Sequence, residues 1–128
     1  MVFKSVKALI ATIGLSLGSA AIAEDLVRYG LTTPGSDYYY DAETIQKYSN
    51  NTVEVWIKVD ASNDKTVPYR ISRQKMRVNC SDGTFGFLAI YSYRADGTVM
   101  TSGETKYPEM NSIVPASTGN TLFKILCP

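Results

Sequence analysis

Three basic side chains alternate along one segment of this sequence, at Arg73, Lys75 and Arg77. In an extended strand, alternate side chains project from one face at intervals of about 7 Å. Such a row of cations would suit a sulfated polysaccharide or an acidic protein segment. The plainer interpretation, which we favour, is a solvated strand face whose cations lie opposite carboxylates of neighbouring strands, such as Glu54 or Asp60.

Aromatic side chains form a second candidate for ligand binding. The sequence has nine tyrosines, including the run Tyr38, Tyr39 and Tyr40. Tyrosine gives a large, rigid contact area with a polar tip and is enriched at protein interfaces. A run of three must expose at least one ring, and Trp56, which shares a strand face with charged residues, joins it as a candidate. The alternative is structural, because tyrosine is also a good strand former.

The residues needed for most enzymatic chemistry are absent. The sequence has no histidine, which removes Ser-His-Asp and Cys-His pairs, histidine general bases and the common zinc ligand sets. It has no glycine-rich phosphate loop and no dinucleotide fingerprint. Neighbouring carboxylates such as Asp41 and Glu43 lie in a polar turn segment, where a solvated surface is the simpler explanation. We therefore expect a non-enzymatic protein without a cofactor or a metal ion.

Cys80 and Cys127 are the two cysteines of the sequence. In an oxidising compartment, an even pair is most simply a disulfide. It would close a loop of about 48 residues and stabilise the fold by roughly 4 kcal/mol in the chain-entropy model. The alternative, two free thiols in a redox or metal site, lacks both a C-x-x-C spacing and a histidine.

Residues 1–23 have the pattern of a secretory signal peptide. Lys4 and Lys7 provide a positive start, residues 8–17 form an apolar run, and Ala-Ile-Ala at 21–23 suits a signal peptidase. The apolar run is too short to span a bilayer. The alternative, a buried N-terminal helix, does not explain why these three features follow in this order.

Cleavage after Ala23 would leave one domain of 105 residues, 24–128. Without Lys4 and Lys7, eleven basic residues stand against twelve acidic ones, so the mature net charge is near −1. This balance does not favour a nucleic-acid partner. We expect no lipid anchor, because no cysteine lies near the cut, and no membrane span. The protein should therefore be periplasmic, or secreted beyond the periplasm.

The mature segment is dominated by strand patterns. Branched apolar residues alternate with polar ones over 51–60, which indicates a half-buried strand. The expected strands span 26–32, 37–40, 51–60, 67–80, 84–94 and 98–106. Asp82-Gly83 and Asp96-Gly97 favour tight hairpin turns in which both central residues have positive φ. The last four strands should form an antiparallel meander.

The C-terminal segment changes to a helical period. Ser117 or Thr118 can cap a helix in which Leu122, Ile125 and Leu126 form one apolar stripe. A bond from Cys127 to the sheet would hold this stripe against one sheet face. We predict an α+β domain with one helix covering one face of an antiparallel sheet.

Several stretches also carry a family resemblance. They are Tyr-Tyr-Tyr-Asp-x-x-Thr-Ile at 38–45, Val-x-Val-Trp-Ile-Lys-Val at 53–59, Cys80, Tyr-x-x-x-Gly at 93–97, Ile-x-Pro-x-Ser at 113–117 and the final Leu126-Cys127. Taken in order, they resemble the surface-adhesin protein E family of Gram-negative bacteria over nearly all of the mature chain.

The resemblance implies a curved antiparallel sheet of about six strands, with the C-terminal helix tied to its concave side by the disulfide. It also implies a surface or secreted protein that can form a homodimer and binds host matrix or serum proteins, such as vitronectin and laminin. Our leading hypothesis is an adhesin-like, non-enzymatic binding protein that acts through a sheet face or a tyrosine-bearing edge. The alternative is a periplasmic accessory or inhibitor protein that binds another protein without surface display.

Overall fold

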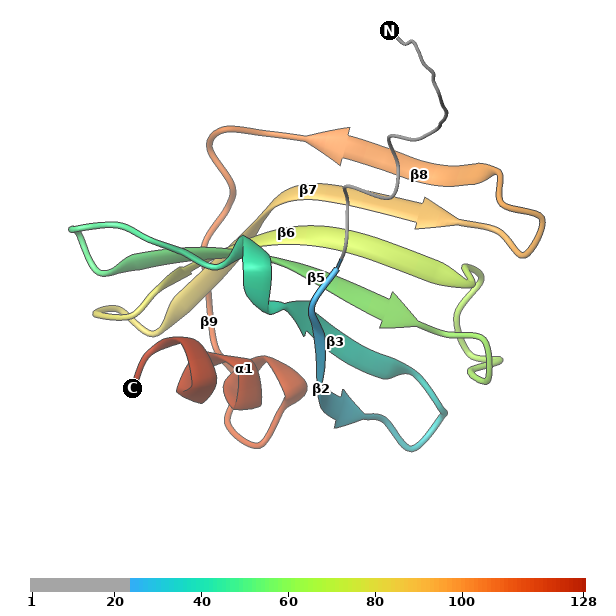
Figure 1. Ribbon diagram of the computed structural model, residues 1–128, viewed down its shortest axis with the longest axis horizontal. Helices are drawn as coiled ribbons and strands as arrows, with labels where there is room; N and C mark the ends of the chain where they lie inside the picture. The colour runs from blue at the N-terminus through green and yellow to red at the C-terminus, as the bar shows by residue number, and fades with distance from the viewer. Residues whose placement is uncertain (1–23) are drawn as a thin grey trace, which may run out of the picture.

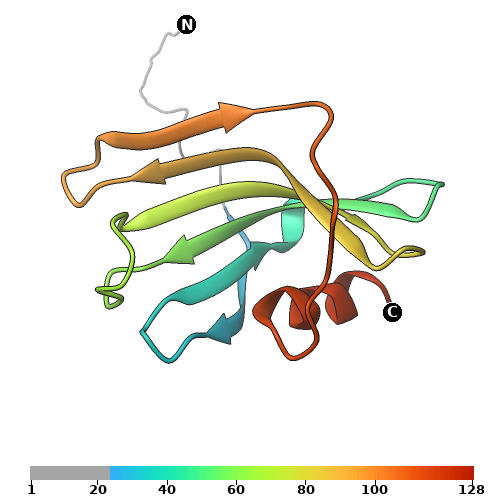
Figure 2. The same cartoon turned by 180° about the vertical axis from the view of Figure 1, so that it is seen from behind.

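One antiparallel sheet dominates the computed structural model, which describes residues 24–128. Its six main strands are β2 (Leu26–Leu31), β3 (Asp37–Asp41), β5 (Thr52–Asp60), β6 (Ile71–Asn79), β7 (Thr84–Tyr93) and β8 (Val99–Glu104). They lie side by side in the order β2-β3-β5-β6-β7-β8 (Figures 1 and 2). The predicted six-stranded sheet and its meander are confirmed. The predicted signal peptide, 1–23, lies outside the described residues.

Two short strands extend this sheet. β4 (Gln46–Lys47) pairs with the start of β5, and β9 (Asn111–Ser112) pairs with the start of β7. A 3-10 turn, η3 (Ala42–Thr44), separates β3 from β4. Neither strand could be predicted from the sequence, because a two-residue segment has no periodicity to detect.

The two Asp-Gly turns differ from the expected geometry. Gly83 and Gly97 have positive φ, 67° and 86°, whereas neither preceding aspartate does. The Gly83 N–H donates to the carbonyl of Asn79 at 3.0 Å, so the first turn is wider than a two-residue hairpin. The left-handed conformation is therefore confined to the glycine, the residue that adopts it without steric cost.

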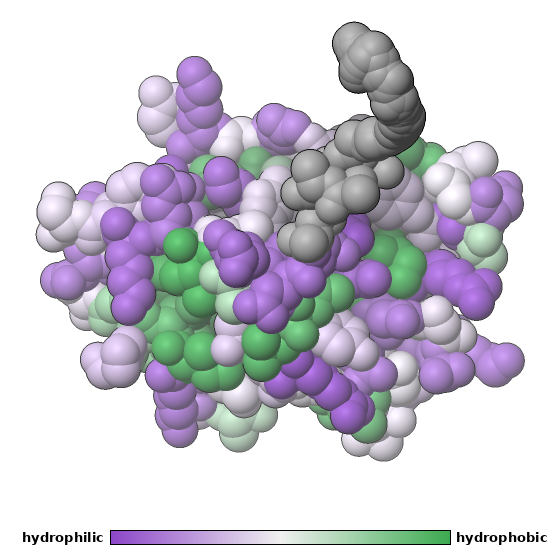
Figure 3. All heavy atoms as spheres, viewed as in Figure 1, coloured by the Kyte–Doolittle hydropathy of each residue, from purple (hydrophilic) through white to green (hydrophobic). Residues whose placement is uncertain are grey.

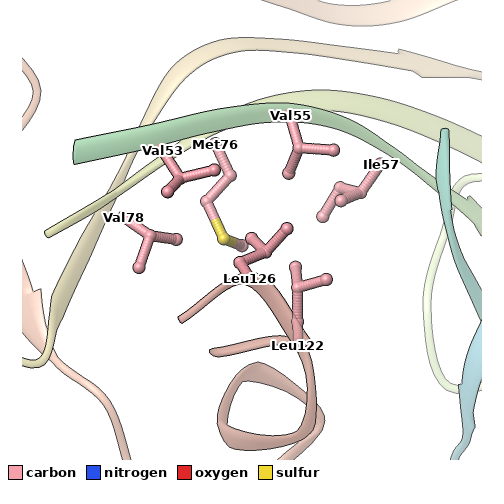
Figure 4. Close-up of a cluster of buried hydrophobic side chains, with 7 residues drawn as sticks. All are labelled: Val53, Val55, Ile57, Met76, Val78, Leu122 and Leu126. Carbon is pink, nitrogen blue, oxygen red and sulfur yellow. The ribbon is translucent and has the colours of Figure 1, made fainter. Parts of the chain in front are cut away.

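The predicted helix is α1 (Thr118–Leu126). Ser117 caps it, accepting a hydrogen bond from the Asn120 N–H at 3.1 Å. Leu122 and Leu126 are 0% and 2% exposed, and they enter the apolar core beneath the sheet, whereas Ile125, the third residue of the predicted stripe, is 41% exposed. That core is made of Val53, Val55, Ile57, Met76, Val78, Leu122 and Leu126 (Figure 4).

The disulfide joins Cys80, just after β6, to Cys127 at the end of α1. The Cα atoms of the two cysteines are 5.6 Å apart. The strands arch over the helix, which lies on the concave side of the sheet (Figure 4). The predicted pairing and the α+β architecture are confirmed. Within residues 24–128, no helix is long and apolar enough to cross a membrane.

Alternation along each strand gives the sheet two different faces. We call the face packed on α1 the inner face and the opposite one the outer face. On β5, Val53, Val55 and Ile57 point inward and are at most 4% exposed. Their neighbours Glu54 and Trp56 point outward. In the space-filling view, hydrophilic side chains cover most of the visible surface and hydrophobic ones gather beside α1 (Figure 3).

Candidate functional site

The predicted basic row lies on the outer face of β6, in the middle of the sheet. Arg73, Lys75 and Arg77 are each partly exposed, with 34–38% of each side chain open to solvent. Across the ladder to β5, they lie opposite Lys58, Trp56 and Glu54, respectively. Each cation of the row therefore faces a different kind of side chain on β5: a cation, an aromatic ring or a carboxylate.

Glu54 holds two of these three cations. Its carboxylate accepts a hydrogen bond from Arg77 Nε at 3.0 Å, and Lys75 Nζ lies 3.7 Å from the same group. The Glu54 side chain is only 8% exposed. Lys75 and Arg77 balance this buried negative charge. The predicted carboxylate partner is thus correct for Glu54. Asp60 is not a partner of the row, because it accepts hydrogen bonds from Ser62 instead.

Arg73 has a different partner, Glu24, at the start of the described chain. The guanidinium donates to both carboxylate oxygens of Glu24. This hydrogen bonding lowers the pKa of Glu24 and raises the pKa of Arg73. The neighbouring Asp25 N–H donates to Asp41 Oδ1 at 3.1 Å, which fixes the segment against β3. The sequence held no local signal for this pair, because the two residues are 49 positions apart.

An aromatic pair adjoins the basic row. The rings of Trp56, on β5, and Tyr91, on β7, stack with centroids 6.4 Å apart and an interplanar angle of 20°. Since β6 lies between these strands, the rings meet above its basic row. Opposite Lys75, β7 presents Ala89, whose small side chain leaves room for the rings. The sequence indicates Trp56 as a candidate, whereas only the fold identifies Tyr91 as its partner.

These groups border a hollow of about 830 Å³ on the outer face. Its lining comes from four strands and the segment after β8: Glu54, Trp56, Lys75, Arg77, Leu88, Ala89, Tyr91, Glu104, Thr105 and Lys106. Among these residues, Trp56, Tyr91 and Arg77 are of the types enriched at protein interfaces.

The tyrosine run does not form one surface. Tyr39 lies opposite Lys58 and shares the outer face with Trp56. Tyr38 and Tyr40 point to the inner face, where both approach Tyr29, with centroid distances of 5.9 and 6.1 Å. All three rings of the run are half-buried. Burial also raises the pKa of Tyr38. The structure therefore places Tyr39, Trp56 and the basic row on the same face of the sheet, and Tyr38 and Tyr40 on the opposite face.

No group of three or more histidine, cysteine, aspartate or glutamate residues within 24–128 is arranged to hold a metal ion. The outer face offers instead ion pairs, one aromatic stack and an open hollow. Such groups can make reversible, non-covalent contacts with a ligand.

Comparison with known proteins gives the family. The model of the surface-adhesin protein E family matches residues 26–128. No curated protein matches the sequence. Among solved structures, Haemophilus influenzae protein E is similar at 18% identity and a TM-score of 0.56, over 83% of this chain and 86% of that one.

Two further structures agree with this. Protein E from non-typeable Haemophilus influenzae matches at 17% identity and a TM-score of 0.57, covering 83% of this chain and 77% of that one. A second crystal form of Haemophilus influenzae protein E matches at 19% identity and a TM-score of 0.51, covering 70% and 79%. At these identities the structures show a shared fold, and the family model shows descent. The chain belongs to the surface-adhesin protein E family.

Proposed function

We propose that this protein is an exported, non-enzymatic binding protein that holds a protein ligand on the outer face of its sheet. The observation that carries the proposal is the Trp56–Tyr91 stack beside Lys75 and Arg77, above a hollow of about 830 Å³. Tryptophan, tyrosine and arginine are the residues that most often dominate binding energy at protein interfaces. Host matrix or serum proteins are the candidate ligands because the chain belongs to a family of surface adhesins.

The two faces support this assignment by contrast. Over β5 and β6 the inner face already has a partner, because α1 covers the apolar residues of these two strands. On the outer face, the half-buried Trp56 and Tyr91 stack on each other and border an open hollow. Glu54 holds Lys75 and Arg77 in place beside these rings. Fixed side chains lose little conformational entropy when a ligand binds, which favours affinity.

The direct test is a solid-phase binding assay of the purified domain 24–128 against matrix and serum proteins. We expect the double variant Trp56→Ala/Tyr91→Ala to bind about tenfold more weakly or worse, since it removes both aromatic contacts. Ile125→Ala is the matched control, because Ile125 is an apolar residue of α1 that is 41% exposed. Unchanged affinity in a folded double variant would refute this face as the binding site.

A triple alanine variant of Arg73, Lys75 and Arg77 tests the cations separately. If the basic row contributes through its charge, affinity falls and the salt dependence of binding weakens. Unchanged, salt-insensitive binding would remove the row from the site and leave the aromatic pair.

Location separates this proposal from the alternative of a periplasmic accessory or inhibitor protein. Protease added to intact cells should digest the protein if it is displayed at the surface. Survival of the protein under conditions that digest a known surface protein would favour the periplasmic role. A homodimer, also part of the proposal, is measured by sedimentation of the purified domain.

A further inference from the structure

The two edges of the sheet differ in how they are protected. At the first edge, β2 has an irregular register between Arg28 and Gly30, and α1 packs against it. A Cβ added to Gly30 would lie 3.0 Å from the Thr118 side chain. Arg28 also pairs with Asp37 at 2.7 Å. A bulge, a covering helix and a charged pair are the usual means of preventing another strand from joining an edge.

The other edge, β8, also has an irregular register, at Met100 near its start, but within residues 24–128 no helix packs against it and none of its side chains forms an ion pair. Its sequence, Val-Met-Thr-Ser-Gly-Glu, contains no proline and no lysine. Five of its six residues are exposed. Within 24–128, no strand pairs with the edge of β8 that faces away from β7. The Thr105 N–H donates to the carbonyl oxygen of Leu88 at 2.9 Å, so it points toward β7. Because N–H groups alternate in direction along a strand, those of Ser102 and Glu104 point away from β7.

A hollow of about 260 Å³ lies beside this edge and is lined only by residues 87–90 and 101–105. Gly103 lies opposite Ile90 in the register, and both belong to the inner face together with Phe87. A Cβ built on Gly103 would meet nothing within 4 Å. The missing side chain thus leaves half-buried apolar atoms of β7 accessible from the edge.

We infer that β8 is a docking edge for an extended segment of a partner protein, which adds to the sheet as an antiparallel strand. The partner's backbone pairs with the outward groups of Ser102 and Glu104. Its residue opposite Gly103 is a large apolar one, and this side chain fills the hollow against Phe87 and Ile90. Backbone pairing gives affinity in this mode of recognition, and the pockets for alternate side chains give specificity.

Charge defines the next position of the partner. Glu104 lies opposite Ala89 on the outer face. It is exposed and makes no ion pair with the residues of 24–128. Opposite charges facing each other across two strands are stabilising. The partner segment therefore carries a basic residue opposite Glu104, next to its apolar residue.

A second copy of this chain does not fit the same edge as well. Pairing through its own β8 would place no basic residue opposite Glu104, because that strand contains neither lysine nor arginine. The charge at this position therefore favours a different protein as the occupant.

The test uses a defined probe, a capped peptide of seven residues with a central leucine, a lysine immediately before it and threonine elsewhere. Titrated into the isotope-labelled domain 24–128, it should shift and protect the amides of Ser102 and Glu104. Peptides with serine in place of the leucine, or glutamate in place of the lysine, should bind at least tenfold more weakly. Equal binding of all three peptides would overturn the assigned partner chemistry.

Two substitutions test the edge itself. Ser102→Pro removes an outward N–H that the fold does not use, and proline is tolerated on edge strands. We expect it to abolish binding, whereas Ser102→Ala, which retains the N–H, should bind as the wild type does. Gly103→Val places a side chain in the hollow, at a position with free space, and should weaken peptide binding at least tenfold. If Ser102→Pro fails to fold, this second variant still tests the edge.

Three outcomes contradict the inference. One is peptide binding that persists unchanged in folded Ser102→Pro or, where that variant does not fold, in Gly103→Val. Another is a peptide that shifts amides around Trp56 and leaves β8 unaffected, which would place it on the outer face. The third is a dimer that Ser102→Pro, or Gly103→Val in its place, converts to a monomer, because the edge would then join two copies of this chain.

Discussion

The inner and outer faces of the sheet are built from the same strands, and they differ in what completes them. On the inner face, Val55 and Leu122 are both 0% exposed, and the disulfide holds the helix on its apolar core. On the outer face, Glu54 balances Lys75 and Arg77, and Trp56 stacks on Tyr91. Over β5 and β6 the inner face is covered by the chain's own helix, whereas the outer face keeps an open hollow above these strands.

This contrast indicates how a small domain can combine a stable fold with a binding surface. A domain of about 100 residues buries only about two-thirds of its unfolded surface, so it has little stability to spare. Here the inner face supplies the apolar burial, and alternate residues of the same strands remain available for contact. Variants of the inner face should therefore change stability more than variants of the outer face do.

The largest effect is expected from the disulfide. Replacing both Cys80 and Cys127 with serine should lower the free energy of unfolding by about 4 kcal/mol, because the unfolded chain regains the entropy of a loop of some 48 residues. The measurement is urea denaturation. Hydrogen exchange should accelerate first in residues 115–128, since the bond joins α1 to the end of β6. Slow exchange in that segment after reduction would show that the disulfide is not what holds α1 against the sheet.

Leu122 gives the next effect. Leu122→Ala should destabilise the domain by about 3 kcal/mol, because a fully buried side chain is replaced by a cavity. Ile125→Ala, on the same helix but 41% exposed, is the control and should change stability by no more than about 0.5 kcal/mol. Equal losses in the two variants would show that α1 is not packed on the inner face as described.

A smaller loss is expected on the outer face. Glu54→Gln keeps the shape of the side chain and removes the charge that faces Lys75 and Arg77, so we expect a loss of about 1–2 kcal/mol. Glu104→Gln, at an exposed carboxylate without an ion pair in 24–128, is the matched control and should be nearly neutral. A loss as large as that of Leu122→Ala would remove the distinction between the faces.

The smallest effect concerns Glu24 and depends on pH. Because hydrogen bonding from Arg73 lowers its pKa in the folded state, Glu24 stabilises the fold above its unfolded pKa, and this contribution is lost as pH falls through the folded pKa. Glu24→Gln should therefore lower the Tm slightly at neutral pH and match the wild type in acid. A difference in Tm that stays constant from neutral pH to below both pKa values would contradict the pairing.

Much of this fold could be predicted from local patterns. Alternation over residues 51–60 identified β5 and its buried face, and the serine before the C-terminal apolar stripe identified the cap of α1. Alternation also predicts that the tyrosine run is split between the two faces of the sheet. In a strand, Tyr39 must point away from Tyr38 and Tyr40, so the run could not form a single patch.

The candidate site was less predictable, because its parts come from different strands. Trp56 and Tyr91 meet only when β5, β6 and β7 lie side by side in one register. Glu24 reaches Arg73 from the far end of the chain. No pattern of spacing indicates such pairs, since residues far apart in sequence are brought together by the pairing of whole strands.

The sequence by itself determined which face of β5 is buried, which residue caps α1 and which cysteines pair, because each follows from the types and order of the residues themselves. The tertiary structure alone decided what lies beside the basic row, that β2 is covered and β8 is open, and that a hollow borders Gly103. Register and strand order depend on the energy of the whole sheet. The outer face therefore became a candidate binding site only once the strands were in place.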